Sequence, residues 1–348
     1  FPGSVPVVAL TVEKPHVLAL LPENTAAAGP VKAGEVLVRV QRAGICGSDL
    51  HIYHGSNPFA VYPRVIGHEF AGTVEAVGDG VTNVAAGDHV VVDPVVSCGR
   101  CYACRAGRTN VCANLEVFGV HRDGGFRNHV VVPAANAVKV RSDLPISIAA
   151  LAEPLSIAAN VLSRTGIAAD DTLLVYGAGT VGLTVVQVAK LHGARCIVVD
   201  LDDKRLERAK EFGADVVLNS SRVSVPDAVR DENDGLGPTV VIDGAGVPAL
   251  LDEACRLASP AARIGLLGFS PAPCNISQQE IVKKELTLVG SRLNRRLLPQ
   301  VIEWLESGKL KPAAMITQVF PIADAASAFS LIETDPSSTI KVQLDFES

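Results

Sequence analysis

The chain has 348 residues, enough for two domains or three small ones. Hydrophobic residues make up 48% and charged residues 20%, a globular balance that excludes a disordered scaffold. The net charge of −6 provides no positive field to gather phosphates, so we expect no nucleic-acid partner.

No segment of the sequence indicates export or a membrane span. Phe1 to Ser4 show no basic region followed by an apolar one, so we expect no signal peptide and a cytoplasmic location. The longest uncharged stretch, Leu173 to Ala189, is broken by glycine, threonine and glutamine. We interpret it as a buried strand that leads into a helix, and we expect no membrane partner.

The first part of the chain, from about residue 10 to residue 139, alternates short β-branched runs with glycine and proline. This pattern is typical of an all-β, barrel-like domain. The clearest predicted strands are Val36–Val40, Gly72–Val77, His89–Val92 and His129–Val132.

After Ser142-Asp143-Leu144-Pro145 the pattern changes to strands that alternate with helices, which indicates βαβ units and a parallel sheet. The predicted strands here are Leu173–Tyr176, Cys196–Asp200, Asp215–Leu218, Val240–Asp243 and Ile264–Gly268. The predicted helices are Lys204–Phe212, Ala249–Ala258 and Leu298–Ser307, and a final strand covers Ile340–Phe346. Periodicity does not decide whether this tail returns to the first domain.

A glycine motif follows the strand Leu173–Tyr176 and opens a predicted helix. In such a motif the first glycine allows a tight turn, the second lets a pyrophosphate approach the backbone, and the third lets helix pack on strand. The helix N-terminus then attracts the phosphate charge. The motif predicts a dinucleotide site formed by Gly177, Gly179, Thr180, Val181 and Gly182.

Asp200 lies at the end of the next predicted strand, where an acid accepts a hydrogen bond from the adenosine ribose. Its charge would repel a 2′-phosphate, so it favours NAD over NADP. The alternative is that the glycines serve only as turns and that Asp200 caps a helix. The complete context of strand, glycines, helix, strand and acid argues against this alternative.

Four of the eight cysteines lie close together. A spacing of two, two and seven intervening residues allows four thiolates to close a tetrahedral shell around a metal. All four positions are then filled, which predicts a structural zinc rather than a catalytic one. The alternatives are two local disulfides or a redox pair, which a reducing cytosol disfavours, and a zinc-ribbon nucleic-acid module, which needs an extended basic face. The four residues are Cys98, Cys101, Cys104 and Cys112.

A second group of potential ligands is dispersed along the chain: Cys46, the pair His68-Glu69, and Glu153 inside an apolar run. Buried acids are rare unless they are paired or bind a metal. Taken singly, each residue has a simpler interpretation. Cys46 is then a core thiol, His68 a core imidazole, and the two glutamates are surface or capping acids.

Taken together, these features resemble the zinc-dependent medium-chain alcohol and polyol dehydrogenases over essentially the whole chain. The segment Gly67–Gly72 is similar to the zinc signature of that family, and the cysteine cluster and the glycine motif follow in the expected order. The resemblance implies an α/β protein with two domains. These are a GroES-like β-barrel catalytic domain over residues 1–150 and 291–348, and a doubly wound Rossmann NAD-binding domain over residues 151–290.

The resemblance also implies a catalytic zinc bound by Cys46 and His68, with Glu69 as an exchangeable third ligand. Glu153 stands where many simple alcohol dehydrogenases have Cys, whereas sorbitol- and threonine-dehydrogenase-like members have Glu. This places the chain in the polyol branch and makes Glu153 a further ligand or catalytic residue. The expected cofactors are two zinc ions per chain, one catalytic and one structural, and NAD.

A zinc site with three protein ligands leaves a position for a substrate hydroxyl and makes its proton easier to remove. Ser48 is placed to accept that proton, and the resemblance implies that the nicotinamide ribose and then His51 continue the relay. It also implies that Arg205 contacts the adenosine ribose. The alternatives are a turn hydroxyl for Ser48, a surface imidazole for His51 and an exposed helix charge for Arg205.

The substrate is less well defined. In sorbitol dehydrogenases a Tyr follows the relay histidine and a late Arg-Tyr pair contacts polyol hydroxyls, but here Ile52 and Arg292-Leu293 stand in these places. Arg292 is retained and is a candidate contact to the coenzyme and to the substrate, because a guanidinium can bind a carboxylate with two hydrogen bonds. A sugar acid such as an aldonate is therefore a candidate substrate. Phe118 and His121 are further candidate substrate contacts, with structural roles as the alternative.

The leading hypothesis is an NAD-dependent zinc dehydrogenase that reversibly oxidises a secondary hydroxyl of a polyol or sugar acid, as a homodimer or homotetramer. The nearest alternative enzyme is an L-threonine 3-dehydrogenase-like oxidase of amino alcohols. A zinc-free quinone reductase of the same fold is disfavoured by the ligands present. A non-enzymatic protein that reuses the fold is a separate alternative, which predicts bound zinc without turnover.

Overall fold

The computed structural model describes residues 8–22 and 31–348; the expectation about Phe1 to Ser4 concerns residues outside this part. The chain divides into two compact units. Unit 1 contains Phe1–Glu153 and Asn294–Ser348, and unit 2 contains Pro154–Leu293. One boundary between the units falls within helix α4 (Ala152–Thr165).

Unit 1 is built on antiparallel sheets, as its β-branched runs predict. Its largest sheet has the order β10-β6-β5-β3-β18-β17, with β9 also paired to β3, and a three-stranded sheet has the order β2-β1-β4. The four predicted strands are confirmed as parts of β3, β5, β6 and β9. The strands are β1 (Val8–Lys14), β2 (Val17–Pro22), β3 (Glu35–Ile45), β4 (Arg64–Val65), β5 (Glu69–Val77), β6 (His89–Val92), β7 (Val95–Val96), β8 (Glu116–Val117), β9 (His129–Pro133), β10 (Ala137–Lys139), β17 (Ile316–Pro321) and β18 (Lys341–Asp345).

Short helices connect these strands, and the last two α-helices come from the C-terminal segment. They are α1 (Gly47–Tyr53), α2 (Tyr102–Arg105), α3 (Ile146–Ala149), α10 (Leu298–Glu306) and α11 (Ala325–Thr334), with 3₁₀ turns at Thr109–Val111, Ala134–Asn136, Pro312–Met315 and Ile322–Asp324. The helix predicted at Leu298–Ser307 is thereby confirmed, whereas α11 was not predicted.

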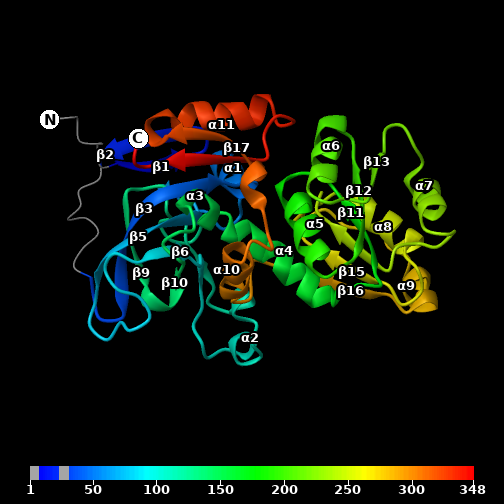
Figure 1. Ribbon diagram of the computed structural model, residues 1–348, viewed down its shortest axis with the longest axis horizontal. Coiled ribbons are helices and arrows are strands. Elements are labelled where there is room, and N and C mark those ends of the chain that lie inside the picture. Colours follow the sequence, from blue (N-terminus) through cyan, green and yellow to red (C-terminus); the bar gives the residue numbers. More distant parts are fainter. Residues whose placement is uncertain (1–7, 23–30) are drawn as a thin grey trace. The chain divides into compact units, whose positions relative to one another are not determined.

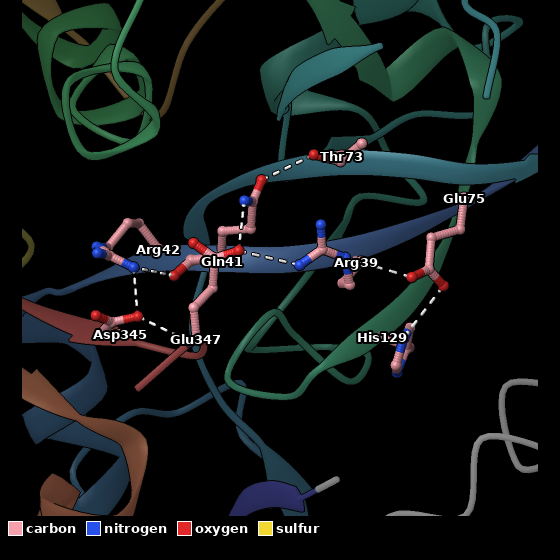
Figure 2. Close-up of polar contacts among 8 residues, drawn as sticks. All are labelled: Arg39, Gln41, Arg42, Thr73, Glu75, His129, Asp345 and Glu347. Atoms are coloured by element: carbon pink, nitrogen blue, oxygen red, sulfur yellow. Dashed lines mark hydrogen bonds and ion pairs between the residues drawn. The ribbon is translucent and has the colours of Figure 1, made fainter. Parts of the chain in front are cut away.

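The C-terminal segment returns to unit 1, as the family resemblance implies. Strand β18 pairs antiparallel with β3 and parallel with β17, and Figure 1 shows these late strands, in red and orange, beside the early ones in blue. Polar contacts join the end of β18 to β3, and Figure 2 shows their continuation to β5 and β9. The residues are Arg39, Gln41, Arg42, Thr73, Glu75, His129, Asp345 and Glu347. Half of these pairs are exposed and individually weak, but together the contacts favour one register of the last strand.

Unit 2 is a parallel six-stranded sheet of order β13-β12-β11-β14-β15-β16, which is the Rossmann order, with helices around it (Figure 1). All five predicted strands exist, although β15 ends at Leu266, two residues earlier than expected, and β16 was not predicted. The strands are β11 (Thr172–Tyr176), β12 (Arg195–Asp200), β13 (Val216–Asn219), β14 (Val240–Asp243), β15 (Arg263–Leu266) and β16 (Thr287–Gly290). The helices after α4 are α5 (Thr180–Leu191), α6 (Asp203–Glu211), α7 (Val225–Glu232), α8 (Pro248–Leu257) and α9 (Gln278–Lys284).

The core of unit 2 follows from the alternation of side chains along its strands. Leu174 and Tyr176 of β11, two residues apart, share one face of the sheet with Ile197 of β12. Val229 of α7 and Leu251 of α8 cover that face. This packing holds the carboxyl ends of the strands at one edge, where loops of such sheets bind ligands.

The uncharged stretch Leu173 to Ala189 forms strand β11 and most of helix α5, which confirms its interpretation as a strand leading into a helix. Among the described residues, one helical stretch, Ile146–Thr165, is long and apolar enough to span a membrane. However, 72% of its most apolar window is buried within the protein, as expected of a core helix.

Candidate functional site

Helix α1 begins directly after Cys46 and brings this residue close to His68. The carboxylate of Asp49, which is fully buried, accepts hydrogen bonds from the backbone N–H of Cys46 at 2.8 Å and of Gly67 at 3.2 Å. The bond to Cys46 is half of a capping box, in which the third helical residue reaches back to the residue before the helix. The same carboxylate lies 3.6 Å from Nδ1 of His68. Asp49 therefore positions both Cys46 and His68.

Glu69 forms a buried ion pair with a lysine from the end of the chain. Nζ of Lys341 lies 2.8 Å from Oε1 and 2.7 Å from Oε2 of Glu69, and it also donates to the carbonyl of Ile45 at 3.1 Å. Both charged side chains are only 2% exposed. Gly44 makes room for them, because a Cβ at this position would lie 2.3 Å from Oε2 of Glu69.

Glu153 is also buried, in the first turn of α4, rather than on the surface. Burial raises the pKa of Glu153 to about 8; the charges of Glu69 and Asp93 add to the rise, while those of His68 and Lys341 oppose it. A carboxyl group in this environment ionises readily only if a further cation is present. Such a strongly perturbed pKa is typical of functional sites.

The residues fit a metal ion. Ligand atoms of Cys46, His68 and Glu69 all lie within 4.8 Å of one another, and sulfur, imidazole nitrogen and carboxylate oxygen are the donors that zinc takes. Nδ1 of His68 lies beside the carboxylate of Asp49, so Nε2, on the side of Ser48, is the ring nitrogen that a metal would take. Burial lowers the pKa of His68, but the charge of Asp49 outweighs this and the pKa is raised well above its usual value. Glu153 lies outside the three-residue group, so its role as a ligand stays a prediction.

The two expected relay residues lie on helix α1. Oγ of Ser48 is 3.4 Å from Nε2 of His68, so the hydroxyl faces the candidate metal site. His51 is exposed, and its Nδ1 is 3.1 Å from Oγ of Ser56. An exposed imidazole can exchange a proton with water, which suits the end of a relay.

The four clustered cysteines converge on a second point. Their sulfur atoms lie within 4.8 Å of one another, with 3.5 Å between Cys101 and Cys104 and 3.9 Å between Cys101 and Cys112. Four sulfurs around a zinc at about 2.3 Å would be separated by about 3.8 Å. All eight cysteines belong to the described residues and are free, so the alternative of local disulfides finds no support.

The electrostatics of this cluster favour a bound cation. Hydrogen bonds from the backbone of Arg100 and Cys101 lower the pKa of Cys98 to about 6. In contrast, burial and the neighbouring sulfurs raise the pKa of Cys104 to about 11. Four thiolates at these distances repel one another, so all four ionise together only around a cation.

The glycine motif forms the loop between β11 and α5. Gly177 has a φ of 94°, which favours glycine, and Gly179 is the N-cap of α5. A Cβ at Gly182 would lie 1.9 Å from the carbonyl oxygen of Gly177, so only glycine lets the helix pack here. Thr180 and Val181 form the start of the helix, where backbone N–H groups point out of its N-terminal end. The loop has the form of an anion-binding helix N-terminus.

Asp200 ends strand β12 beside this loop. Its carboxylate accepts hydrogen bonds from the backbone N–H groups of Ala178 at 2.7 Å, Leu201 at 2.7 Å and Asp202 at 2.9 Å. The N-cap of α6 is Asp202, so the alternative that Asp200 caps this helix is wrong. Arg205 lies half-buried in the first turn of α6.

The candidate substrate residues occupy different environments. Arg292 follows β16, with its guanidinium carbon 5.5 Å from the centre of the Phe269 ring. Phe118 is fully buried, and its ring meets that of Phe70 edge-on, which favours a packing role. Nδ1 of His121 accepts a hydrogen bond from the backbone of Val117 at 3.2 Å.

Sequence reasoning missed two residues of the candidate metal site, Asp49 and Lys341. The spacing from Cys46 to Asp49 is a signal for the first, because it matches a capping box. Lys341, Gln343 and Asp345 alternate with apolar residues along Ile340–Phe346, so the sequence gives no signal that the lysine is buried. Its partner in the sequence is not apparent without the fold.

Comparisons with known proteins agree with this geometry. Residues 32–142 match the family described as alcohol dehydrogenase GroES-like domain, and residues 180–307 match zinc-binding dehydrogenase. The starvation-sensing protein RspB of Escherichia coli K12 is 49% identical over 97% of this chain and 98% of its own. The chain belongs to the zinc-binding medium-chain dehydrogenase family.

Other members of the family include proteins of known activity. L-threonine 3-dehydrogenase of Pyrococcus abyssi is 38% identical over 89% of this chain and 91% of its own length. L-galactonate-5-dehydrogenase of E. coli K12 is 33% identical over 85% of this chain and 87% of its own length. A crystal structure described as a short chain alcohol dehydrogenase (rspB) from E. coli CFT073, complexed with NADH, has a TM-score of 0.93. It is 47% identical and covers 98% of this chain and 100% of that one.

Family membership confirms the predicted fold, which combines a GroES-like domain with a Rossmann domain. It also confirms that the chain is an enzyme, a dehydrogenase of alcohol groups that uses zinc and a nicotinamide coenzyme. The hypotheses of a zinc-free reductase and of a non-enzymatic protein lose their support.

Replacing Lys341 with Met tests the buried ion pair of this dehydrogenase. The change leaves the Glu69 carboxylate buried without its cation, so we expect the free energy of unfolding to fall by about 3–5 kcal/mol. Denaturant unfolding measures this. The control is Lys283→Met, which removes an exposed pair with Glu280 and should cost less than about 1 kcal/mol. Equal costs for the two variants would contradict the account.

Replacing Cys101 with Ser tests the four-cysteine site. We expect one zinc fewer per chain than in the wild type, and a loss of about 2–5 kcal/mol in unfolding free energy, the scale of losing a cross-link. Metal analysis and thermal unfolding measure the two effects. Cys274→Ser, at an exposed cysteine, is the control and should change neither. An unchanged metal content in the Cys101 variant would rule out this zinc site.

Proposed function

We propose that this protein is a zinc-dependent dehydrogenase that oxidises a secondary hydroxyl of a sugar acid, or of a related polyol, with NAD, and that the reaction is reversible. The observation that carries the proposal is the convergence of Cys46, His68 and Glu69, held by the buried Asp49. The similarity to an L-galactonate-5-dehydrogenase supports a sugar acid as the substrate class.

The chemistry divides between cofactors and side chains. When bound, zinc supplies a Lewis acid that eases the loss of a hydroxyl proton, and NAD supplies the hydride acceptor. In this proposal Cys46, His68 and Glu69 hold the catalytic zinc, with Glu153 as a further ligand. Ser48 accepts the substrate proton, and the exposed His51 passes a proton to water at the end of the relay.

We further propose that the loop Gly177–Gly182 holds the coenzyme and that NAD is preferred to NADP. A carboxylate offers about four acceptor sites, and three backbone N–H groups occupy three of those on Asp200. The remaining site suits an adenosine ribose hydroxyl, whereas a 2′-phosphate would meet the negative charge. Arg205 is the candidate second contact to the ribose.

Arg292 is the proposed recognition residue for the substrate carboxylate. Its guanidinium is half-buried and rests on the ring of Phe269, and a planar guanidinium binds a carboxylate with two parallel hydrogen bonds. L-threonine also carries a carboxylate and a secondary hydroxyl. L-threonine 3-dehydrogenation is therefore the second candidate function, favoured by the 38% identity to an enzyme of that name.

We also propose roles for the two units, a zinc content, a cellular location and an assembly state. Unit 1 acts as the catalytic domain and unit 2 as the coenzyme domain. Each chain holds two zinc ions, and the protein works in the cytoplasm as a homodimer or homotetramer.

A substrate panel tests the proposed function. Aldonates, the matching hexitols and L-threonine are each assayed with NAD and with NADP. We expect aldonates to be oxidised with a kcat/KM about tenfold to a hundredfold above that of the hexitols, because a hydrogen-bonded ion pair contributes about 1.5–3 kcal/mol. Activity confined to L-threonine would contradict the sugar-acid assignment.

Two cysteine variants control this panel. Cys46→Ser should abolish turnover with every substrate while the protein remains folded, because it removes a ligand of the catalytic metal. Cys274→Ser should keep full activity, because this cysteine is exposed and lies in unit 2. Unchanged turnover in the Cys46 variant would show that the metal assignment is wrong.

A further inference from the structure

Asn160 of helix α4 is fully buried and holds the segment that follows strand β16. Its Nδ2 donates hydrogen bonds to Oγ of Ser291 at 3.0 Å, to the carbonyl of Arg292 at 3.3 Å and to the carbonyl of Leu293 at 2.9 Å. One side-chain amide thus binds two successive backbone carbonyls and a hydroxyl. The orientation of both peptide groups depends on it.

The segment that Asn160 holds contains a strained residue. Leu293 has a φ of 51°, in the left-handed region, which costs a residue with a Cβ about 1–2 kcal/mol. Such a conformation persists only where the surroundings enforce it. The hydrogen bonds to the carbonyls of Arg292 and Leu293 enforce it from both sides of the strained Cα.

Burial of the Asn160 side chain is energetically unfavourable on one side of its amide group. Its Oδ1 is buried and has no hydrogen-bond partner among residues 8–22 and 31–348. A buried acceptor without a partner costs about 1–3 kcal/mol. An apolar side chain would avoid this cost, so packing alone does not explain the asparagine. Its contribution is the pair of N–H donors that face the segment after β16.

The segment carries Arg292, the proposed carboxylate-binding residue. Phe269 follows β15 and Arg292 follows β16, so both lie at the carboxyl edge of the parallel sheet, as does Gly177 after β11. The Phe269 ring is 67% exposed, and the Arg292 guanidinium lies over it at 5.5 Å. Stacking on Phe269 fixes the orientation of the guanidinium plane. The backbone of Arg292, from which the side chain projects, fixes where that plane lies.

We propose that Asn160 is a positioning residue for substrate recognition: it fixes the backbone from which Arg292 presents its guanidinium, stacked on Phe269, to the carboxylate of the substrate. The inference rests on the proposed function, in which the substrate is a sugar acid. A two-bond interaction between guanidinium and carboxylate depends on orientation, so loss of the backbone support weakens it even though Arg292 itself is intact.

The test is a double-mutant cycle with Asn160→Leu, Arg292→Gln and both changes together. Steady-state kinetics are measured with L-galactonate and with the hexitol of matching configuration. The readout is the KM for L-galactonate divided by the KM for the hexitol. We expect Arg292→Gln to raise the ratio about tenfold to a hundredfold and Asn160→Leu to raise it at least about threefold. In both variants kcat for the aldonate should change less than the KM does, because binding is lost rather than chemistry.

The cycle separates positioning from a general structural effect. If Asn160 acts through Arg292, Asn160→Leu raises the ratio no further in the Arg292→Gln background. Gln187→Leu is the matched control, because Gln187 is another buried amide of unit 2 whose Nε2 donates within its own helix, to the carbonyl of Leu183. This control should leave the ratio unchanged. Asn160→Ser, whose hydroxyl is too short to reach the segment, replaces Asn160→Leu if the leucine variant does not fold.

The results distinguish the inference from the function on which it rests. If Arg292→Gln raises the ratio and neither Asn160 variant does, Asn160 is not a positioning residue and the sugar-acid assignment stands. If the effects of Asn160→Leu and Arg292→Gln multiply independently, Asn160 acts by another route and the inference is overturned. If Arg292→Gln leaves the ratio unchanged, Arg292 does not bind the substrate carboxylate and the inference fails, whereas the sugar-acid assignment itself is decided by the substrate panel.

Discussion

The buried ion pair between Lys341 and Glu69 is the interaction on which unit 1 depends. Removal of two charges from water costs several kcal/mol for each, so the pair is tolerable only with close contact and additional hydrogen bonds. Close contact requires β18, which begins at Lys341, to lie beside β3, and it requires a glycine at position 44. The last strand of the chain is therefore part of the candidate metal site as well as of the sheet. Folding of the C-terminal segment and assembly of that site are one event in this account.

The charge balance around this pair indicates what completes the site. Glu69, Glu153 and Asp93 are all buried in unit 1, and Lys341 is the one fully buried lysine of the described part. Burial raises the pKa of both Glu153 and Asp93, so the protein alone does not stabilise all the carboxylates in their charged form. A divalent cation at Cys46 and His68 would supply the missing positive charge. The same arrangement of acids that is costly in the protein alone is suited to holding zinc.

The sequence was most informative where a function needs residues that are close together in the chain. The four cysteines lie in one loop, so their spacing predicted a metal site, and the glycine motif lies in one turn, so its spacing together with the flanking strands, helix and acid predicted a coenzyme site. Lys341 and Asn160 were missed because their partners are 272 and 131 residues away in sequence, and the contact of Asp49 with Gly67 spans 18 residues. The physical reason for each appears only when the sheets bring the partners together. Strand β16 was missed because it has only four residues, begins three positions after the last residue of helix α9 and shows no clear alternation.

The central claim is that a catalytic zinc binds where Cys46, His68 and Glu69 converge, apart from the zinc of the four cysteines. Anomalous X-ray scattering above and below the zinc absorption edge, on crystals of the purified protein, tests it most directly. The account predicts two zinc peaks in each chain, one among Cys98, Cys101, Cys104 and Cys112 and the other bound to Cys46 and His68. A peak among the four cysteines alone, in protein that oxidises its substrate, would contradict the account.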